Sequence, residues 1–518
     1  MTENRRIFLN VIATYGRSIY GLILGLLCGR WALMALGEID YGLYGLVGGL
    51  TVFITFFNNI LAGANARFYA VSIGAVKSAA DKTAALEECR RWFNTALSVH
   101  AAVPLILIIV GYPLGVWAIE NWLTIPTERI SDCVWVFRFV CLNCFVGMLN
   151  VPFSAMYGAK QYIAELTIYS FVTSTLNVCA LGYMVTHPGI WLAKYAAWMC
   201  VISVVPQLII CVRACVVFPE CRIKRIYLWD PAYIRRLGVY SFWQFIGVLC
   251  GMLRTSGITI VINKFFGAAM NAAQAIGNTV QAQCNTLAGA MQSAFVPVIT
   301  QACGAGDYVK MNKFVLRVCK FNVFLSFIFM IPLALELPEV MRLWLKNPPS
   351  YTTGLCYCAM LLYLSGACTV GHMVAVNAVG KIAGYYMVLG AVNIFVLPVA
   401  ITVGYFYRNV YVVMGTVIFF ECLNSLGRMV FARRHARSSV WAWIKGVAVP
   451  AIVTLAISLP LGYSVRFFMI ESFIRVVVTT IVCEAVLLPT LWFVILNNEE
   501  RDFIRERVLD KIIKKFRK

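Results

Sequence analysis

The chain has 518 residues, of which 61% are hydrophobic and only 13% are charged. A water-soluble protein of this length would need much more polar surface to cover its cores, so the composition excludes a soluble globular protein. The formal charge of +21 does not indicate nucleic-acid binding, because the basic residues gather in short loops between apolar runs, as in the cytoplasmic loops of membrane proteins.

Apolar runs recur along the whole chain, and each is long enough for a transmembrane helix, since a hydrocarbon core ~30 Å thick needs roughly 20 residues. We expect an all-α membrane protein with about fourteen transmembrane helices. They are expected at 8–33, 41–70, 92–118, 134–158, 163–186, 190–216, 237–262, 273–300, 315–338, 353–378, 383–406, 409–431, 445–465 and 470–496. Lys and Arg concentrate in 213–236, 428–445 and 497–518, which places both chain ends in the cytoplasm.

A basic amphipathic tail follows the last expected helix. Phe503, Ile504, Val508, Leu509, Ile512, Ile513 and Phe516 recur at helical spacing, with Arg505, Lys511, Lys514 and Lys515 between them. We expect this tail to lie on the anionic inner leaflet, which makes membrane lipids a partner.

The sequence also contains an internal repeat. Leu61-Ala62-Gly63-Ala64 in the second expected helix recurs as Leu287-Ala288-Gly289-Ala290 in the eighth. Both halves begin in the cytoplasm, so an axis along the membrane normal would relate them. We expect an N-terminal lobe of about six helices over 1–216, a similar C-terminal lobe over 217–431, two additional helices over 432–496, and the tail over 497–518.

Side-chain amides form two stripes inside these segments. One runs along the eighth expected helix as Gln274, Asn278, Gln281, Asn285 and Gln292, and the other includes Asn58 and Asn65 of the second. An amide that faces lipid without a partner costs several kcal/mol, so both stripes should meet protein or water. Hydrogen bonding between packed helices would explain one stripe, but stripes on two equivalent helices favour a hydrated central cavity.

Cations are found deep in the expected helices. Arg17 and Arg254 lie far enough inside to suggest that they face a cavity. Arg67 lies toward the inner end of the second expected helix, where it could face the cavity or extend to the headgroups. Arg30, Arg138, Lys194 and Arg475 lie near helix ends and should extend to the headgroups. A guanidinium group suits phosphate or diphosphate, so the pattern favours an anionic substrate. No nucleophile–base pair, P-loop or metal-ligand cluster is recognisable, and we expect a protein that is not an enzyme, with no catalytic residues, metal or cofactor.

Several stretches resemble bacterial polysaccharide flippases of the O-antigen type (the "lipopolysaccharide biosynthesis protein" group). The superfamily also contains the MATE drug exporters and the lipid II flippase. The similar stretches are Leu36 to Tyr44 with Val47-Gly48-Gly49, Ile125 to Arg129, Val151-Pro152-Phe153, Phe218 to Cys221, Phe266 to Gln274, Gly304 to Asp307, Leu343 to Lys346 and Glu499-Glu500-Arg501. The chain departs from the family at Val296-Pro297, where many relatives have Asn-Pro.

The resemblance implies a flippase of the bacterial inner membrane. It would move an undecaprenyl-diphosphate-linked oligosaccharide (an O-antigen, capsule or exopolysaccharide repeat unit) from the inner to the outer leaflet by alternating access. Arg17, Arg67 and Arg254 would hold the diphosphate, and the amide stripes would bind sugar hydroxyls. The family also implies Na⁺ or H⁺ as any coupling ion, and polysaccharide assembly enzymes as further partners.

Three other functions stay open at this point. A Na⁺- or H⁺-coupled multidrug exporter of the same superfamily would need an acidic site in the first lobe, which the sequence does not offer. A membrane glycan polymerase or ligase usually has a large outward loop, but the expected outward loops 119–133 and 338–352 are short. A structural scaffold would have no use for costly buried arginines.

Overall fold

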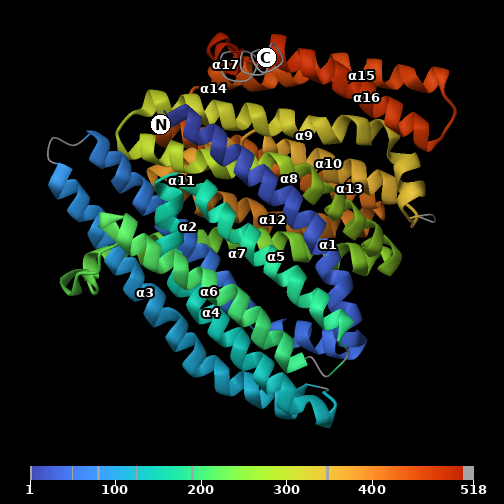
Figure 1. Cartoon of the computed structure of the whole chain (residues 1–518). Helices are drawn as coiled ribbons and strands as arrows, with labels where there is room; N and C mark the ends of the chain where they lie inside the picture. The colour runs from blue at the N-terminus through green and yellow to red at the C-terminus, as the bar shows by residue number, and fades with distance from the viewer. Residues whose placement is uncertain are drawn as a thin grey trace, which may run out of the picture. The chain divides into compact units, whose positions relative to one another are not determined.

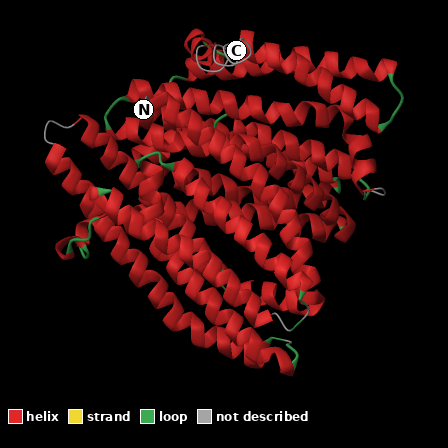
Figure 2. Cartoon of the chain, viewed as in Figure 1, coloured by secondary structure: helices red, strands yellow, loops and turns green. Residues whose placement is uncertain are grey.

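The computed structural model describes residues 3–49, 51–78, 82–123, 125–187, 189, 192–345 and 349–505. Within these ranges the chain is helical and contains no strand (Figure 2). In the part of the chain that the structure describes, ten helices are long and apolar enough to cross a membrane, and the number rises to twelve if each of two bent helix pairs is one span. The expected all-α, multi-pass class is confirmed, whereas the count of about fourteen helices and the orientation stay predictions.

The chain divides into two compact units. The first contains Met1–Phe245 and Ser293–Met311, and the second contains Ile246–Gln292 and Asn312–Lys518. Two long helices, α7 (Pro231–Phe266) and α8 (Ala268–Gly304), therefore contribute residues to both units. The four-part division expected from the sequence stays a prediction.

The first unit is a bundle of long helices with a core of apolar side chains. Its helices are α1 (Glu3–Gly49), α2 (Val52–Ser78), α3 (Lys82–Trp117), α4 (Ile130–Ala159), α5 (Ile163–Thr186) and α6 (Leu192–Val217), with short turns η1 (Ala118–Trp122), η2 (Thr127–Arg129), η3 (Pro219–Cys221) and η4 (Arg225–Tyr227). Helix α4 packs against α2, α3 and α6, and α1 packs against α5 (Figure 1). Val47, Val136 and Leu192 are fully buried where these helices meet.

Two glycines allow α2 and the end of α8 to approach closely within the first unit. A side chain on Gly74 would overlap the backbone carbonyl of Gln301, and one on Gly304 would overlap the carbonyl of Val71. The side chain of Gln301 also donates to the carbonyl of Ala159 at the end of α4. This crossing therefore needs backbone-to-backbone contact, which only glycine permits.

The second unit contains most of the remaining helices. They are α9 (Tyr308–Leu345), α10 (Thr352–Ala367), α11 (Val370–Val379), α12 (Ala383–Tyr407), α13 (Val410–Ala436), α14 (Val440–Trp443), η5 (Ile444–Ala448), α15 (Val449–Phe468), α16 (Phe473–Thr490), η6 (Leu491–Ile495) and α17 (Asn498–Ile504). Helix α13 packs against α10, α11 and α12, and α15 lies beside α16 (Figure 1).

Several helices extend beyond the expected apolar runs because polar residues cap them. The carboxylate of Asp230 accepts from the backbone N–H of Ala232 at 3.0 Å, so α7 begins at Pro231 rather than at 237. Asp307 accepts from the N–H of Lys310 at 2.9 Å and starts α9 in the same way. Gly37, with φ of 74°, makes the expected turn in α1.

The last described helix, α17, is anchored to α9. Asn497 and Glu500 form a capping box at its start. The carboxylate of Glu500 also pairs with Lys320 at 2.5 Å and with Arg317 at 2.8 Å, while Glu499 pairs with Lys313. Burial alone would raise the pKa of Glu500, but the two cations and the backbone N–H of Asn497 lower it. The rest of the expected tail, 506–518, lies outside the described residues.

Candidate functional site

A break between two helices that together are long and apolar enough to cross a membrane forms the centre of the candidate site. The sequence predicts a single helix over 353–378, but the structure has α10 and α11, bent by 41°. Such a break leaves backbone carbonyl groups without helical partners. Side chains donate to four of these carbonyls in succession: Ser425 to Ser365, Arg428 to Gly366, Asn322 to Ala367, and Trp443 to Cys368.

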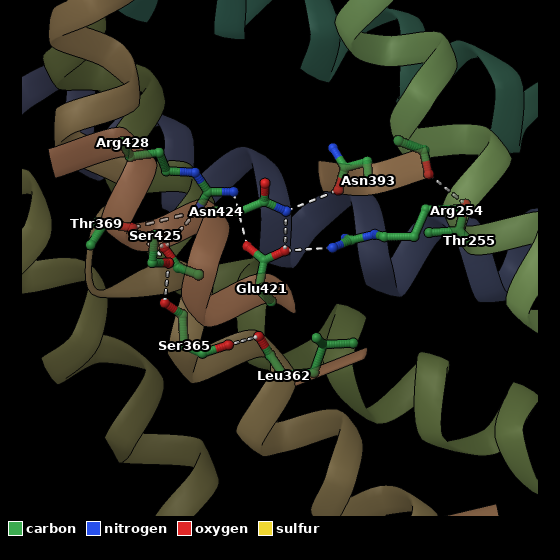
Figure 3. Close-up of polar contacts among 12 residues, drawn as sticks. Arg254, Thr255, Leu362, Ser365, Thr369, Asn393, Glu421, Asn424, Ser425 and Arg428 are labelled. Atoms are coloured by element: carbon green, nitrogen blue, oxygen red, sulfur yellow. Dashed lines mark hydrogen bonds and ion pairs between the residues drawn. The ribbon is translucent and has the colours of Figure 1, made fainter. Parts of the chain in front are cut away.

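An ionic network lies beside this break. The carboxylate of Glu421, on α13, accepts from Arg254 of α7 at 2.6 Å and from Arg428 of α13 at 2.9 Å. Figure 3 shows the carboxylate between the two guanidinium groups. The side chain of Glu421 is 6% exposed, whereas those of Arg254 and Arg428 are each 17% exposed. The arginines are therefore the more accessible members of the network.

Amide and hydroxyl groups surround these charges (Figure 3). The Nδ2 of Asn424 donates to Asn393 at 2.9 Å and lies 3.5 Å from the Glu421 carboxylate. The hydroxyl of Thr369 donates to Ser425 at 3.0 Å. Among the described residues, the buried Oδ1 of Asn424 and the buried Nε of Arg428 have no hydrogen-bond partner. Buried polar atoms are usually paired, so the site has capacity for a further ligand or water.

The charges in this network do not cancel. Two guanidinium groups share one carboxylate, which leaves one excess positive charge, and each gives that carboxylate a single N–H. A guanidinium has five N–H donors in a planar fork, so both arginines keep donors for another acceptor. The arrangement is thus suited to binding an anion.

The structure holds Arg67, another predicted ligand of the diphosphate, among aromatic rings. Its guanidinium lies 4.7 Å from the ring centroid of Phe68 and 4.8 Å from that of Tyr240. These contacts fix the position of a half-buried cation. Arg17, in α1, is exposed, and none of the residues that the structure describes forms an ion pair with it.

The predicted amide residues fall into buried and open groups. Asn65 is buried, with its Nδ2 3.3 Å from the Nε2 of His100. Asn58 is half-buried, and its Oδ1 has no partner among the described residues. On α8, Gln274 is buried, Gln281 and Gln292 are half-buried, and Asn278 and Asn285 are exposed. Asn285 accepts from the hydroxyl of Tyr363 at 3.4 Å. The α8 stripe is therefore open at two of its five positions.

One arginine that was expected to extend to the headgroups is buried instead. Arg475 is 5% exposed and donates twice to Glu336, with distances of 3.1 and 2.8 Å. Thr479 donates to the same carboxylate at 3.0 Å, and Arg466 lies 3.6 Å from it. This second network also joins a glutamate to arginines, but Glu336 and Arg475 are both buried, with 1% and 7% of their side chains exposed.

The sequence gives Glu421 no evident role, and Arg428 falls where the expected helix 409–431 overlaps the basic segment 428–445. Their spacing of seven residues puts both on one face of α13, which could have been recognised as a pair. Glu421 and Arg254 are 167 positions apart, so no local sequence pattern predicts that they form an ion pair.

Neither a protein-family model nor a curated protein matches the sequence. Solved structures do match. An outward-facing multidrug resistance MATE family transporter of the MOP superfamily has 16% identity and a TM-score of 0.62, covering 83% of this chain and 94% of that chain. A MATE in the bent conformation has 15% identity and a TM-score of 0.62, covering 84% and 96%.

A third solved structure is a MOP superfamily transporter from Pyrococcus furiosus, described as having a binding pocket of reverse polarity. It has 13% identity and a TM-score of 0.61, covering 84% of this chain and 96% of that chain. At these identities the likeness shows the fold alone, so the chain has a MATE-like transporter fold. A multi-pass membrane protein with transporter neighbours is therefore established.

Proposed function

We propose that the protein is a flippase that moves an undecaprenyl-diphosphate-linked oligosaccharide from the inner to the outer leaflet of the bacterial inner membrane. The observation that carries this proposal is the excess positive charge on Arg254 and Arg428 around Glu421, inside membrane-spanning helices. Intramembrane cations are costly and are kept where they act on a substrate. A diphosphate supplies negative charge and several acceptor oxygens for their free N–H groups.

Other predicted residues suit a lipid-linked oligosaccharide by their chemistry. Arg17, in the first unit, is an exposed guanidinium of the kind that binds phosphate. Asn278 and Asn285 present amides on the open part of α8, and amides both donate to and accept from sugar hydroxyls. The short expected outward loops and the transporter fold favour transport over glycan polymerisation or ligation.

A multidrug exporter is the second candidate, because MATE transporters with the same fold include a multidrug resistance protein. A cationic drug needs a carboxylate that is free to pair with it. Glu421 already contacts two arginines, so this network suits an anion better than a cation. For the Pyrococcus furiosus transporter, the reverse polarity of the binding pocket is described as suggesting a different function.

Reconstitution separates the two candidates. The full chain, placed in liposomes, should translocate a labelled undecaprenyl-diphosphate-linked oligosaccharide, and Arg254→Gln should reduce the rate at least tenfold. An exposed Arg in a loop, Arg222→Gln, is the matched control and should not change the rate. Export of a cationic dye such as ethidium, with no translocation of the lipid-linked oligosaccharide, would favour the drug exporter and refute the flippase.

A further inference from the structure

We propose that Glu421 is an internal occupant of the anion site formed by Arg254 and Arg428, and that substrate diphosphate displaces it. In the resting state the carboxylate neutralises part of the positive charge; on binding, phosphate oxygens take over both guanidinium groups. This inference rests on the proposed function and adds a mechanism of regulation to the same site.

The geometry of the ion pairs allows this exchange. Arg254 reaches one carboxylate oxygen, Oε2, and Arg428 reaches the other, Oε1, so neither contact is bidentate. Two guanidinium groups held apart by a bridging carboxylate match the two linked phosphate groups of a diphosphate. Both arginines also keep exposed area that Glu421 lacks, which gives an incoming anion access to them.

Charge also favours the exchange. Opening the site without a substitute anion would leave two partly buried guanidinium groups unpaired, which is strongly unfavourable. A diphosphate carries more negative charge than one carboxylate, so it compensates the two arginines more completely. The arginines therefore stay paired in both states, and only the identity of the anion changes.

The surroundings accommodate the resting carboxylate and offer a partner to the displaced one. A Cβ at Gly366 would lie 2.9 Å from the Oε1 of Glu421, so the resting position of the carboxylate depends on a glycine at 366. Asn424, at 3.5 Å, can receive the carboxylate more closely after it leaves the arginines. The orphan Nε of Arg428 provides an additional donor for the incoming anion.

Glu336 provides a matched internal comparison. Its carboxylate is 1% exposed, and it binds both Nε and Nη2 of Arg475 together with Thr479. Arg475 has only 7% of its side chain exposed. Arg466, with 29% of its side chain exposed, also lies 3.6 Å from this carboxylate, but Glu471 lies 3.8 Å from Arg475. Two carboxylates thus face two arginines around Glu336, whereas one carboxylate faces two arginines at the α10–α11 break.

The test measures diphosphate affinity on the full-length protein in nanodiscs. Farnesyl diphosphate and inorganic pyrophosphate are the probes, titrated by calorimetry into wild type, Glu421→Gln and Glu336→Gln. The Glu421→Gln variant lacks the competing carboxylate, so its affinity for diphosphate should be about tenfold higher than that of the wild type, equivalent to ~1.4 kcal/mol. Glu336→Gln loses a comparable ion pair, and it should bind with wild-type affinity. Equal or weaker binding by Glu421→Gln would overturn the proposal.

A second variant keeps every charge. In Gly366→Ala the added methyl group would lie 2.9 Å from the Oε1 of Glu421 and 3.4 Å from the Nη1 of Arg428, so it crowds the carboxylate more than the arginine, and the carboxylate lies at the end of a flexible side chain. This variant should also bind pyrophosphate more tightly, and it decides the matter if Glu421→Gln does not fold. Unchanged affinity in Gly366→Ala would then refute the exchange. If the wild-type protein binds and translocates the lipid but neither variant gains affinity, only this inference is refuted. If the wild-type protein binds no diphosphate, the proposed function is refuted as well.

Discussion

Glu500 should control whether α17 stays attached to α9. In Glu500→Ala, Lys320 loses its partner although it is only 7% exposed, and the capping box at Asn497 loses one of its two arms. Removing one partner of a buried ion pair costs ~3–5 kcal/mol, and loss of a cap costs about 0.5–2 kcal/mol. Part of Lys320 will gain water when α17 detaches, so we expect local opening to become easier by about 3 kcal/mol.

Hydrogen–deuterium exchange of the α17 amides measures this opening. A change of about 3 kcal/mol corresponds to a rise of roughly 100-fold in the exchange of protected amides. Glu499→Ala is the control, because the side chain of Glu499 is 68% exposed and its ion pair with Lys313 should contribute little. If the two variants exchange equally fast, the anchoring role of Glu500 is refuted.

Acid should detach the same helix. The folded-state pKa of Glu500 is lowered, so its stabilisation is fully present above the ordinary Glu pKa of about 4.3 and is lost as pH falls through the lower folded value. Exchange in α17, corrected for the intrinsic pH dependence, should therefore accelerate below about pH 4 in wild type. Glu500→Gln should show no such acceleration.

Three further substitutions test the packing of the helices. Gly74→Ala should lower stability by ~1–3 kcal/mol because its methyl group overlaps backbone, whereas Gly111→Ala, in open space, should be neutral in a thermal-unfolding assay. Arg475→Met should cost ~3–5 kcal/mol, and adding Glu336→Leu should restore most of it; additive losses in the double-variant cycle would contradict the pairing. Trp443→Phe removes a donor to a carbonyl at the α10–α11 break and should cost about 1–3 kcal/mol, with faster exchange confined to α11; unchanged α11 protection would count against this role.

The sequence predicts the helices well and their breaks poorly. Spans such as α5 over Ile163–Thr186 follow from apolar length, a property that one segment carries by itself. The α10–α11 break has no proline to announce it and depends on donors from other helices, so it could not be predicted locally. Hydropathy alone places the starts of α7 and α9 too late, because the polar capping residues Asp230 and Asp307 lie outside the apolar runs.

The same distinction applies to the candidate site. Arg254 could be singled out because a deep arginine is unusual in any spanning segment. Its partner Glu421 could not be assigned, since ion pairing between distant helices requires the tertiary fold. Arg475 shows the converse error: its position near a helix end suggested the headgroups, but Glu336, 139 residues earlier, buries it.

The carbonyl groups at the α10–α11 break accept hydrogen bonds from side chains of α9, α13 and α14, so three other helices stabilise the bend. One of these donors, Arg428, is also a member of the charged network (Figure 3). An anion that binds Arg428 therefore contacts one of the donors at the bend, while the other three donors still hold α10 and α11 together. A residue of the small charged site is thus also one of the residues that stabilise the bend between α10 and α11.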